Sequence, residues 1–73
     1  MLEKRSLNLS GHRTSVALEP EFWAALEEAA AARGITLPAL VAEQDAARAE
    51  AGAALASALR VYALRATRAA AGR

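Results

Sequence analysis

The small supply of large apolar side chains is the feature of this sequence that most limits its fold. Hydrophobic residues make up 55% of the 73 residues, but 22 of them are alanine and only 18 are larger. A chain of this length buries only about 60% of its unfolded surface and usually needs a disulfide, a metal or a partner subunit. The absence of cysteine excludes a disulfide frame and a zinc–thiolate site. Oligomerisation remains, so we expect a single domain that is completed by a second copy.

Two further classes of protein are excluded by composition. The uncharged stretches are far shorter than the roughly 20 apolar residues of a membrane span, and residues 1–5 lead into an alternating polar segment instead of a signal core. A soluble, cytoplasmic chain is therefore expected. With one histidine and no nucleophile elbow, an enzyme would lack its acid–base partner. We expect neither enzymatic activity nor a cofactor, and no metal site.

The net charge of +1 is distributed unevenly along the chain. Residues 1–18 carry a net charge of +2, residues 19–50 of −5, and residues 51–73 of +4. An acidic middle between two basic ends is typical of a surface that meets phosphate groups or acidic partners. It is equally compatible with an alanine-rich helical protein that its charges keep soluble.

The N-terminal part alternates between polar and apolar or small residues, and this period of two predicts extended structure. Leu7 and Leu9 lie in one alternating stretch and Val16 in another, with an interruption around Gly11. The pattern predicts a strand over residues 13–18. It leaves open whether the preceding residues form a second strand or an irregular arm.

Helices are predicted for the rest of the chain. Pro20 suits the first turn of a helix over residues 20–33, and Gly34 suits its end. Thr36 is a good N-cap for a second helix over residues 37–50.

A third helix is predicted over residues 53–70. Gly52 marks a break before it, although glycine costs only about 1 kcal/mol relative to alanine, so the two helices could be continuous. One side of this helix is suited to packing against the others, with Leu55, Ala58, Leu59, Tyr62 and Ala66. The expected fold class is mostly α with one short β-strand per chain.

The order strand, proline-initiated helix, glycine and capped second helix resembles the ribbon-helix-helix DNA-binding proteins. The residues that carry this resemblance are Arg13-Thr14-Ser15-Val16-Ala17-Leu18, Pro20, Gly34, Thr36, Leu40 and Val41. Nearly the whole chain is similar to a group of small bacterial ribbon-helix-helix proteins. That similarity is carried by Lys4-Arg5-Ser6-Leu7, Gly11-His12-Arg13-Thr14-Ser15-Val16, Leu18-Glu19-Pro20-Glu21-Phe22-Trp23 and Ser57-Ala58-Leu59-Arg60-Val61-Tyr62.

The resemblance implies a ribbon-helix-helix dimer with an additional C-terminal helix. One strand from each chain would pair antiparallel, and the ribbon would enter the major groove of DNA. A strand over residues 13–18 has no partner within the chain unless residues 4–10 fold back, which agrees with pairing between two copies. The chain would divide into a basic arm or extra strand (1–12), a ribbon-helix-helix core (13–50) and a C-terminal amphipathic helix (51–73).

The resemblance also implies roles for single residues. If Val16 and Leu18 point inward, the other side of the strand faces base edges, with Arg13, Ser15 and Ala17. Phosphate contacts are expected from the N-terminal arm and the start of the second helix, with Lys4, Arg5, His12, Thr36 and Leu37. The dimer core is expected to contain Val16, Leu18, Phe22, Trp23, Leu26, Leu40 and Val41.

The sequence therefore predicts a homodimeric ribbon-helix-helix regulator of transcription, a repressor of its own or a neighbouring operon, with double-stranded DNA as partner. An alternative is an antitoxin-like or adaptor module that binds another protein through residues 53–70. A third possibility is a basic amphipathic peptide at a membrane surface.

Overall fold

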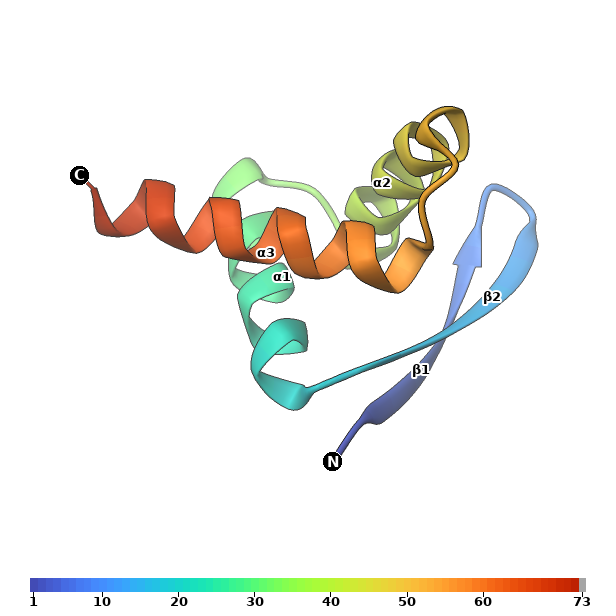
Figure 1. The fold of residues 1–73 in the computed structure, drawn as a ribbon, viewed down its shortest axis with the longest axis horizontal. Helices are drawn as coiled ribbons and strands as arrows, with labels where there is room; N and C mark the ends of the chain where they lie inside the picture. The colour runs from blue at the N-terminus through green and yellow to red at the C-terminus, as the bar shows by residue number, and fades with distance from the viewer. Residues whose placement is uncertain (73) are drawn as a thin grey trace.

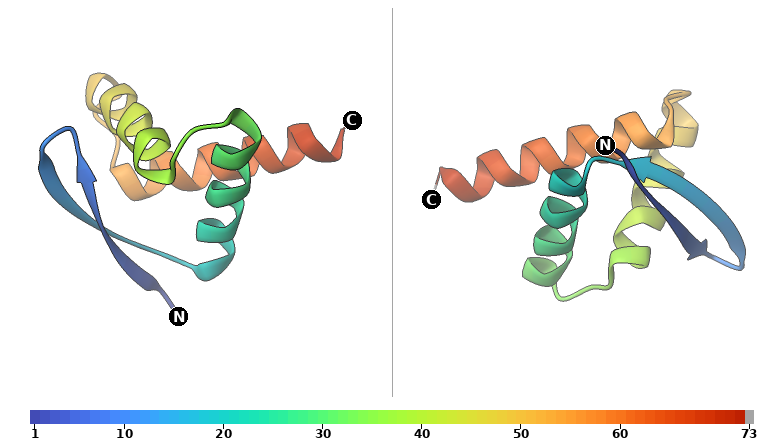
Figure 2. Two further views of the ribbon diagram at one scale, coloured as in Figure 1. Left: turned by 180° about the vertical axis from the view of Figure 1, so that it is seen from behind. Right: turned by 90° about the horizontal axis from the view of Figure 1, so that it is seen from below.

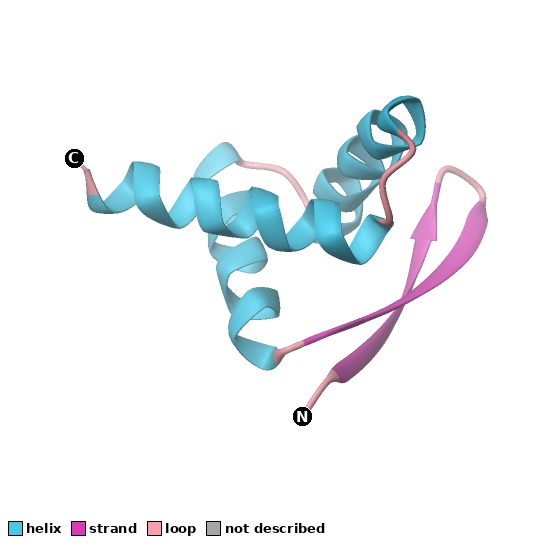
Figure 3. Cartoon of the chain, viewed as in Figure 1, coloured by secondary structure: helices cyan, strands magenta, loops and turns pink. Residues whose placement is uncertain are grey.

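The computed structural model describes residues 1–72 and contains an antiparallel ribbon followed by helices that cover one of its faces (Figure 1). The elements in chain order are β1 (Glu3–Leu9), β2 (His12–Leu18), α1 (Pro20–Arg33), α2 (Leu37–Ala51) and α3 (Leu55–Ala71). Figure 3 shows the division between an extended N-terminal part and a helical remainder. The predicted mostly helical fold, a ribbon followed by helices with an additional C-terminal helix, is confirmed.

The ribbon differs from the prediction in one respect, because a single chain supplies both of its strands. β1 pairs with β2 in a register that places Leu9 opposite His12 and Glu3 opposite Leu18. Ser10 (φ 50°) and Gly11 (φ 90°) join them, and a two-residue type I′ hairpin turn requires positive φ at both positions. The expectation of one strand per chain is wrong, because residues 3–9 form a second strand that pairs with β2 within the same chain. The alternative of an extra strand before residue 13 is confirmed.

The helix boundaries follow the predicted caps. Gly34 (φ 70°) ends α1 in the left-handed conformation, and the Thr36 side chain accepts a hydrogen bond from the Ala39 amide at 3.2 Å. Gly52 (φ 71°) ends α2, so α2 and α3 are separate helices and not one continuous helix.

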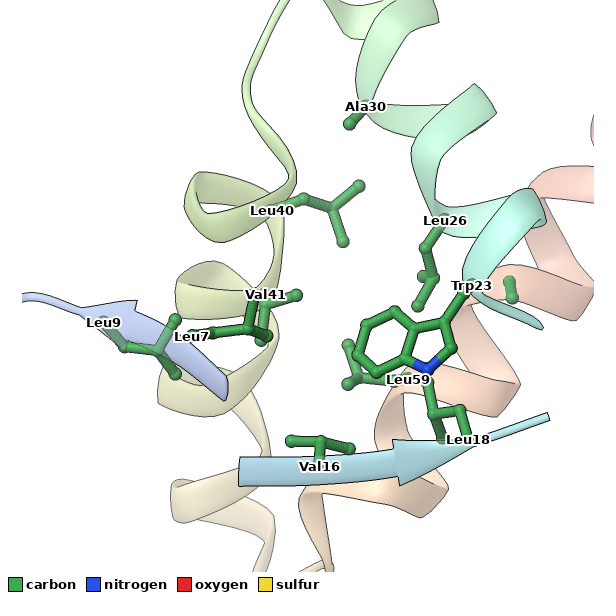
Figure 4. Close-up of a cluster of buried hydrophobic side chains, with 11 residues drawn as sticks. Leu7, Leu9, Val16, Leu18, Trp23, Leu26, Ala30, Leu40, Val41 and Leu59 are labelled. Atoms are coloured by element: carbon green, nitrogen blue, oxygen red, sulfur yellow. The ribbon is translucent and has the colours of Figure 1, made fainter. Parts of the chain in front are cut away.

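One apolar core lies between the inner face of the ribbon and the helices (Figure 4). The ribbon contributes Leu7, Leu9, Val16 and Leu18; the helices contribute Trp23, Leu26, Ala30, Leu40, Val41, Leu59 and Ala63. Among the side chains of the described part of the chain, no buried polar atom lacks a hydrogen-bond partner.

The residues predicted for a dimer core therefore belong to the core of this one chain. All of them are buried except Phe22, which is partly buried against the cluster. The apolar supply suffices within the chain because β1 and α3 add side chains that the strand-helix-helix segment lacks. α3 packs across α1, α2 and β2, and its Leu59 is fully buried, so α3 is an integral part of the fold (Figures 1 and 2).

None of the helices within residues 1–72 has the length and apolar content needed to cross a membrane.

Candidate nucleic-acid interface

The ribbon has one face that no other element covers. Every second side chain of each strand points away from the helices. The side chains between them point toward the helices and include the core residues Leu7, Leu9, Val16 and Leu18. We call the uncovered surface the ribbon outer face, and it consists of Lys4, Ser6, Asn8, Arg13, Ser15 and Ala17. Figure 2 shows the ribbon from two sides, with all three helices on its inner side.

The ribbon outer face is organised in three cross-strand pairs. Lys4 lies opposite Ala17, Ser6 opposite Ser15 and Asn8 opposite Arg13. The Ser6 and Ser15 Oγ atoms are 3.2 Å apart, so one hydroxyl donates to the other. The ribbon outer face therefore carries neutral polar side chains along its length and a cation near each end.

The two cations of this face, Lys4 and Arg13, are both exposed. Within the described residues, no carboxylate lies within ion-pair distance of Lys4 or Arg13. Four residue steps along the ribbon separate their cross-strand pairs, which corresponds to about 14 Å at 3.4 Å per residue. The strands of a sheet lie about 4.8 Å apart, so a two-stranded ribbon is narrow enough for the major groove of DNA, which is about 12 Å wide.

Arg5 lies on the inner side of the ribbon and holds it against α1. Its Nε donates to Glu3 at 2.6 Å and its Nη1 donates to Glu27 at 2.7 Å. Its guanidinium lies 4.8 Å from the centre of the Trp23 ring, and the Trp23 indole N–H donates to the Glu3 carbonyl at 2.8 Å. The hydrogen bonds from Arg5 to Glu27 and then to Glu3 raise the pKa of Arg5.

Two comparisons with known proteins found a match for this architecture. The profile of the ribbon-helix-helix domain family matches residues 2–67. The chain belongs to the ribbon-helix-helix domain family. Its structure is similar to that of an uncharacterized protein from Bordetella pertussis Tohama I, with a TM-score of 0.81 and 39% sequence identity. The match covers 99% of this chain and 60% of the Bordetella protein, so the chain spans less than two thirds of the length of that protein. A comparison with curated proteins found no significant match.

Membership of the ribbon-helix-helix family confirms the predicted resemblance, and the ribbon outer face belongs to the ribbon of that family's fold. The family fold is of a type found in DNA-binding regulators, and its members generally form dimers and bind DNA. The alternation predicted that Arg13, Ser15 and Ala17 would point outward; the structure places the first two as exposed and Ala17 as half-exposed on the ribbon outer face. Their contacts with bases remain a prediction.

The predicted phosphate-binding residues do not all lie on the ribbon outer face. Lys4 is exposed on the ribbon outer face, whereas Arg5 is turned inward, contrary to its predicted place in a free arm. His12 is exposed beside the turn, opposite Leu9.

The start of α2 lies on the helical side of the ribbon. The Thr36 hydroxyl is occupied in capping α2, the Leu37 side chain packs partly against the core, and α2 itself packs against β1. Contacts of Thr36 and Leu37 with phosphate also remain a prediction.

Sequence reasoning did not assign Ser6 and Asn8 to the DNA-facing set. The signal was present, because both alternate with Leu7 and Leu9 as Arg13 and Ser15 alternate with Val16. Across residues 1–72, no group of three or more potential metal ligands is assembled.

Proposed function

We propose that this ribbon-helix-helix protein is a cytoplasmic, DNA-binding regulator of transcription that inserts its own hairpin into the major groove. The observation that supports this function is the ribbon outer face, an exposed polar strip with a cation near each end and, within residues 1–72, no ion pair to either cation. Half to two-thirds of protein–DNA hydrogen bonds go to phosphate and sugar, and base edges supply the specificity.

The turn-proximal pair of the ribbon outer face has the chemistry to distinguish bases. Arg13 can donate two hydrogen bonds to guanine O6 and N7, and Asn8 beside it can pair with adenine N6 and N7. Ser15 can donate or accept, and the Ala17 methyl can contact a thymine methyl. Lys4, at the other end, is placed for a phosphate.

We further propose that the hairpin of each subunit binds DNA on its own, in place of the predicted ribbon shared between two chains. Edge-to-edge pairing of two hairpins would give a four-stranded sheet with about 14 Å between its outer strands. Such a sheet is wider than the groove of about 12 Å before its side chains are counted.

The proposed active form is a homodimer that acts as a repressor. Specific protein–DNA interfaces bury about 1,000–2,500 Å² of protein surface, and single modules bury about 600–1,000 Å². One hairpin corresponds to a single module, so two copies on neighbouring half-sites would reach the specific range. A dimer bound in this way upstream of a gene would hinder transcription of that gene, which is the action of a repressor.

The test is a titration of the full chain with the DNA upstream of its own gene at several salt concentrations. Lys4→Ala should weaken binding to all sequences and lower the slope of log K against log salt by about 0.9. Arg13→Ala should instead cost about 1–3 kcal/mol of discrimination at one base pair.

Arg48→Ala is the matched control, because it removes an arginine from the helical side, where Arg48 pairs with Asp45 at 2.8 Å. Affinity that does not change with salt, or an Arg13→Ala variant that behaves like Arg48→Ala, would overturn the proposed function. A variant that loses an associated protein while its DNA binding is unchanged would favour the antitoxin-like or adaptor module instead.

A further inference from the structure

The outward side of α3 combines exposed apolar side chains with exposed arginines. Val61 is 43% exposed and Leu64 is 53% exposed, and they lie on the side of α3 opposite the fully buried Leu59. In Figure 1 α3 lies in front of α1, and no element covers its outer side. We call this surface the α3 outer face, and it consists of Ser57, Val61, Leu64, Arg65 and Arg68, all of them exposed.

The charge of α3 has a single sign. The helix contains Arg60, Arg65 and Arg68 and no acidic residue. Arg60 is held within the chain, because its Nη2 lies 3.0 Å from a carboxylate oxygen of Glu19. Within the described residues, no carboxylate lies within ion-pair distance of Arg65 or Arg68. The α3 outer face therefore presents two cations beside two large apolar side chains, and this combination suits a partner with carboxylates and apolar groups together.

A depression lies on each side of the apolar pair. One of about 400 Å³ lies between α2 and α3 and is lined by Val61 and Arg65. The other, of about 220 Å³, lies between α1 and α3 and is lined by Leu64 and Phe22. Alanines supply much of both linings, with Ala47, Ala51, Ala53 and Ala58 in the first and Ala25 and Ala63 in the second. Apolar side chains of a partner can therefore enter on either side of α3.

The dimensions of the α3 outer face match one helix. Eleven residue steps separate Ser57 from Arg68, which corresponds to about 17 Å or three turns at 1.5 Å per residue. A helix that binds a groove does so through apolar anchors that recur every three or four residues. Carboxylates on the flanks of such a helix would pair with Arg65 and Arg68.

Other occupants fit this surface less well. A second α3 would bring arginines against arginines. Phosphates of a nucleic acid would pair with the arginines but would leave Val61 and Leu64 without an apolar partner. Membrane-surface helices bury a broader apolar face than two large side chains provide.

We propose that the α3 outer face binds an acidic amphipathic helix of another protein. The apolar side of that helix covers Val61 and Leu64 and enters the two depressions, and its carboxylates pair with Arg65 and Arg68. This site goes beyond the proposed function and does not depend on it, because the α3 outer face shares no residue with the ribbon outer face. A partner held by α3 would be brought to the DNA that the hairpin binds.

The first test uses a defined probe and the full chain, without DNA. The probe is a labelled, alanine-based helical peptide of about 20 residues, with leucines every three or four residues and glutamates on both flanks. Its fluorescence anisotropy should show saturable binding of one peptide per chain. A matched peptide with lysines in place of the glutamates should bind at least about tenfold more weakly. Equal binding of the two peptides, or binding of neither, would contradict the proposal.

Two variants locate the binding site. Leu64→Glu should weaken binding of the glutamate peptide at least about tenfold, because it places a carboxylate in the apolar contact. Ala31→Glu adds the same charge to an exposed position of α1 that lines neither depression, and it should leave the affinity nearly unchanged. Trp23 fluorescence and Tm show that both variants are folded. Equal effects of the two substitutions would show that the peptide does not bind at α3.

A charge exchange tests the ion pairs. The double variant Arg65→Glu, Arg68→Glu should reverse the preference, so that the lysine peptide binds more tightly than the glutamate peptide. The control, Lys4→Glu with Arg13→Glu, makes the same change in net charge on the ribbon outer face. It should keep the preference for the glutamate peptide, because charges are screened over about 8 Å at about 0.15 M salt. A preference that the control reverses would place the peptide on the ribbon and refute the α3 site.

Two further measurements identify a different occupant of the α3 outer face. Sedimentation equilibrium in which Leu64→Glu separates a dimer, without an effect on the peptide, would assign the face to a second copy. Sedimentation with phosphatidylserine vesicles that Leu64→Glu abolishes would assign it to a membrane. Either result would overturn the proposal. Peptide binding without DNA binding would leave only the α3 site, whereas DNA binding without peptide binding would leave only the proposed function.

Discussion

Leu9→Ala tests the finding that this chain supplies both strands of its ribbon and completes its own core. Leu9 is 1% exposed and points from β1 towards the helices, in the same cluster as Val41 (Figure 4). Replacement of a buried leucine by alanine costs about 2–5 kcal/mol, from lost transfer free energy and the cavity left behind. A domain of this size has a free energy of unfolding of about 4–11 kcal/mol, at roughly 0.05–0.15 kcal/mol per residue. We therefore expect a loss of about 3 kcal/mol, a large part of the total.

Urea and thermal unfolding at low protein concentration measure this loss. Trp23 is the single tryptophan and is fully buried, so its fluorescence reports exposure of the core. A loss of about 3 kcal/mol corresponds to a fall in Tm of about 12–24 °C, at roughly 4–8 °C per kcal/mol for domains of this length. Leu2→Ala is the control, because Leu2 is 51% exposed and its truncation should change stability by less than about 0.5 kcal/mol.

Two results would refute the reasoning. A loss below about 1 kcal/mol for Leu9→Ala would show that β1 does not contribute to the core. A Tm that rises steeply with protein concentration, with no folded monomer detected even at the lowest concentration, would show that one chain does not complete its own core, because a fold that needs a second copy is stabilised by mass action.

Three further predictions concern the turn, a helix cap and pH. Gly11→Ala should lower the free energy of unfolding by about 1–2 kcal/mol in urea titrations, because Gly11 has φ 90°; Gly72→Ala, at φ −81°, should be nearly neutral. Thr36→Ala should cost about 1 kcal/mol in the same titrations, because it removes the N-cap of α2. The hydrogen bond from Arg33 lowers the pKa of Glu43, so the stabilisation from this pair is complete above the ordinary pKa of a glutamate and is lost as pH falls through the lowered value. The difference in Tm between wild type and Glu43→Gln should therefore narrow in acid, and a constant difference from neutral pH to about pH 3 would contradict this account.

The local structure was predictable because short-range rules decide it. Pro20, Gly34 and Thr36 occupy positions that suit their own backbone or hydrogen-bonding chemistry, and the observed helix ends lie at those positions. The outward direction of Arg13 and Ser15 followed from alternation, since successive side chains of a strand point to opposite faces.

The short-range rules that predict the helix ends do not determine which strand pairs with β2. A period of two shows that one face of a strand is buried, but it does not say which backbone completes the pair. Leu7 and Leu9 carried the alternation of a second strand, and positive φ at Gly11 is what allows that strand to fold back within the chain. The place of Arg5 depended on this outcome, because only a paired β1 brings its side chain over Trp23 and beside Glu27.

Closure of the core within one chain changes what a dimer is needed for. The sequence suggested that association completes folding, but β1 adds Leu7 and Leu9 to the core and α3 adds Leu59, all with less than a tenth of their surface exposed. A protein that folds alone can associate through a small surface, because association does not have to complete its core. Substitutions in such a surface should then separate the subunits without unfolding them. Such variants would bind one half-site with the affinity of a single hairpin, and the ratio of their affinity to that of the wild type would measure how much the second hairpin contributes.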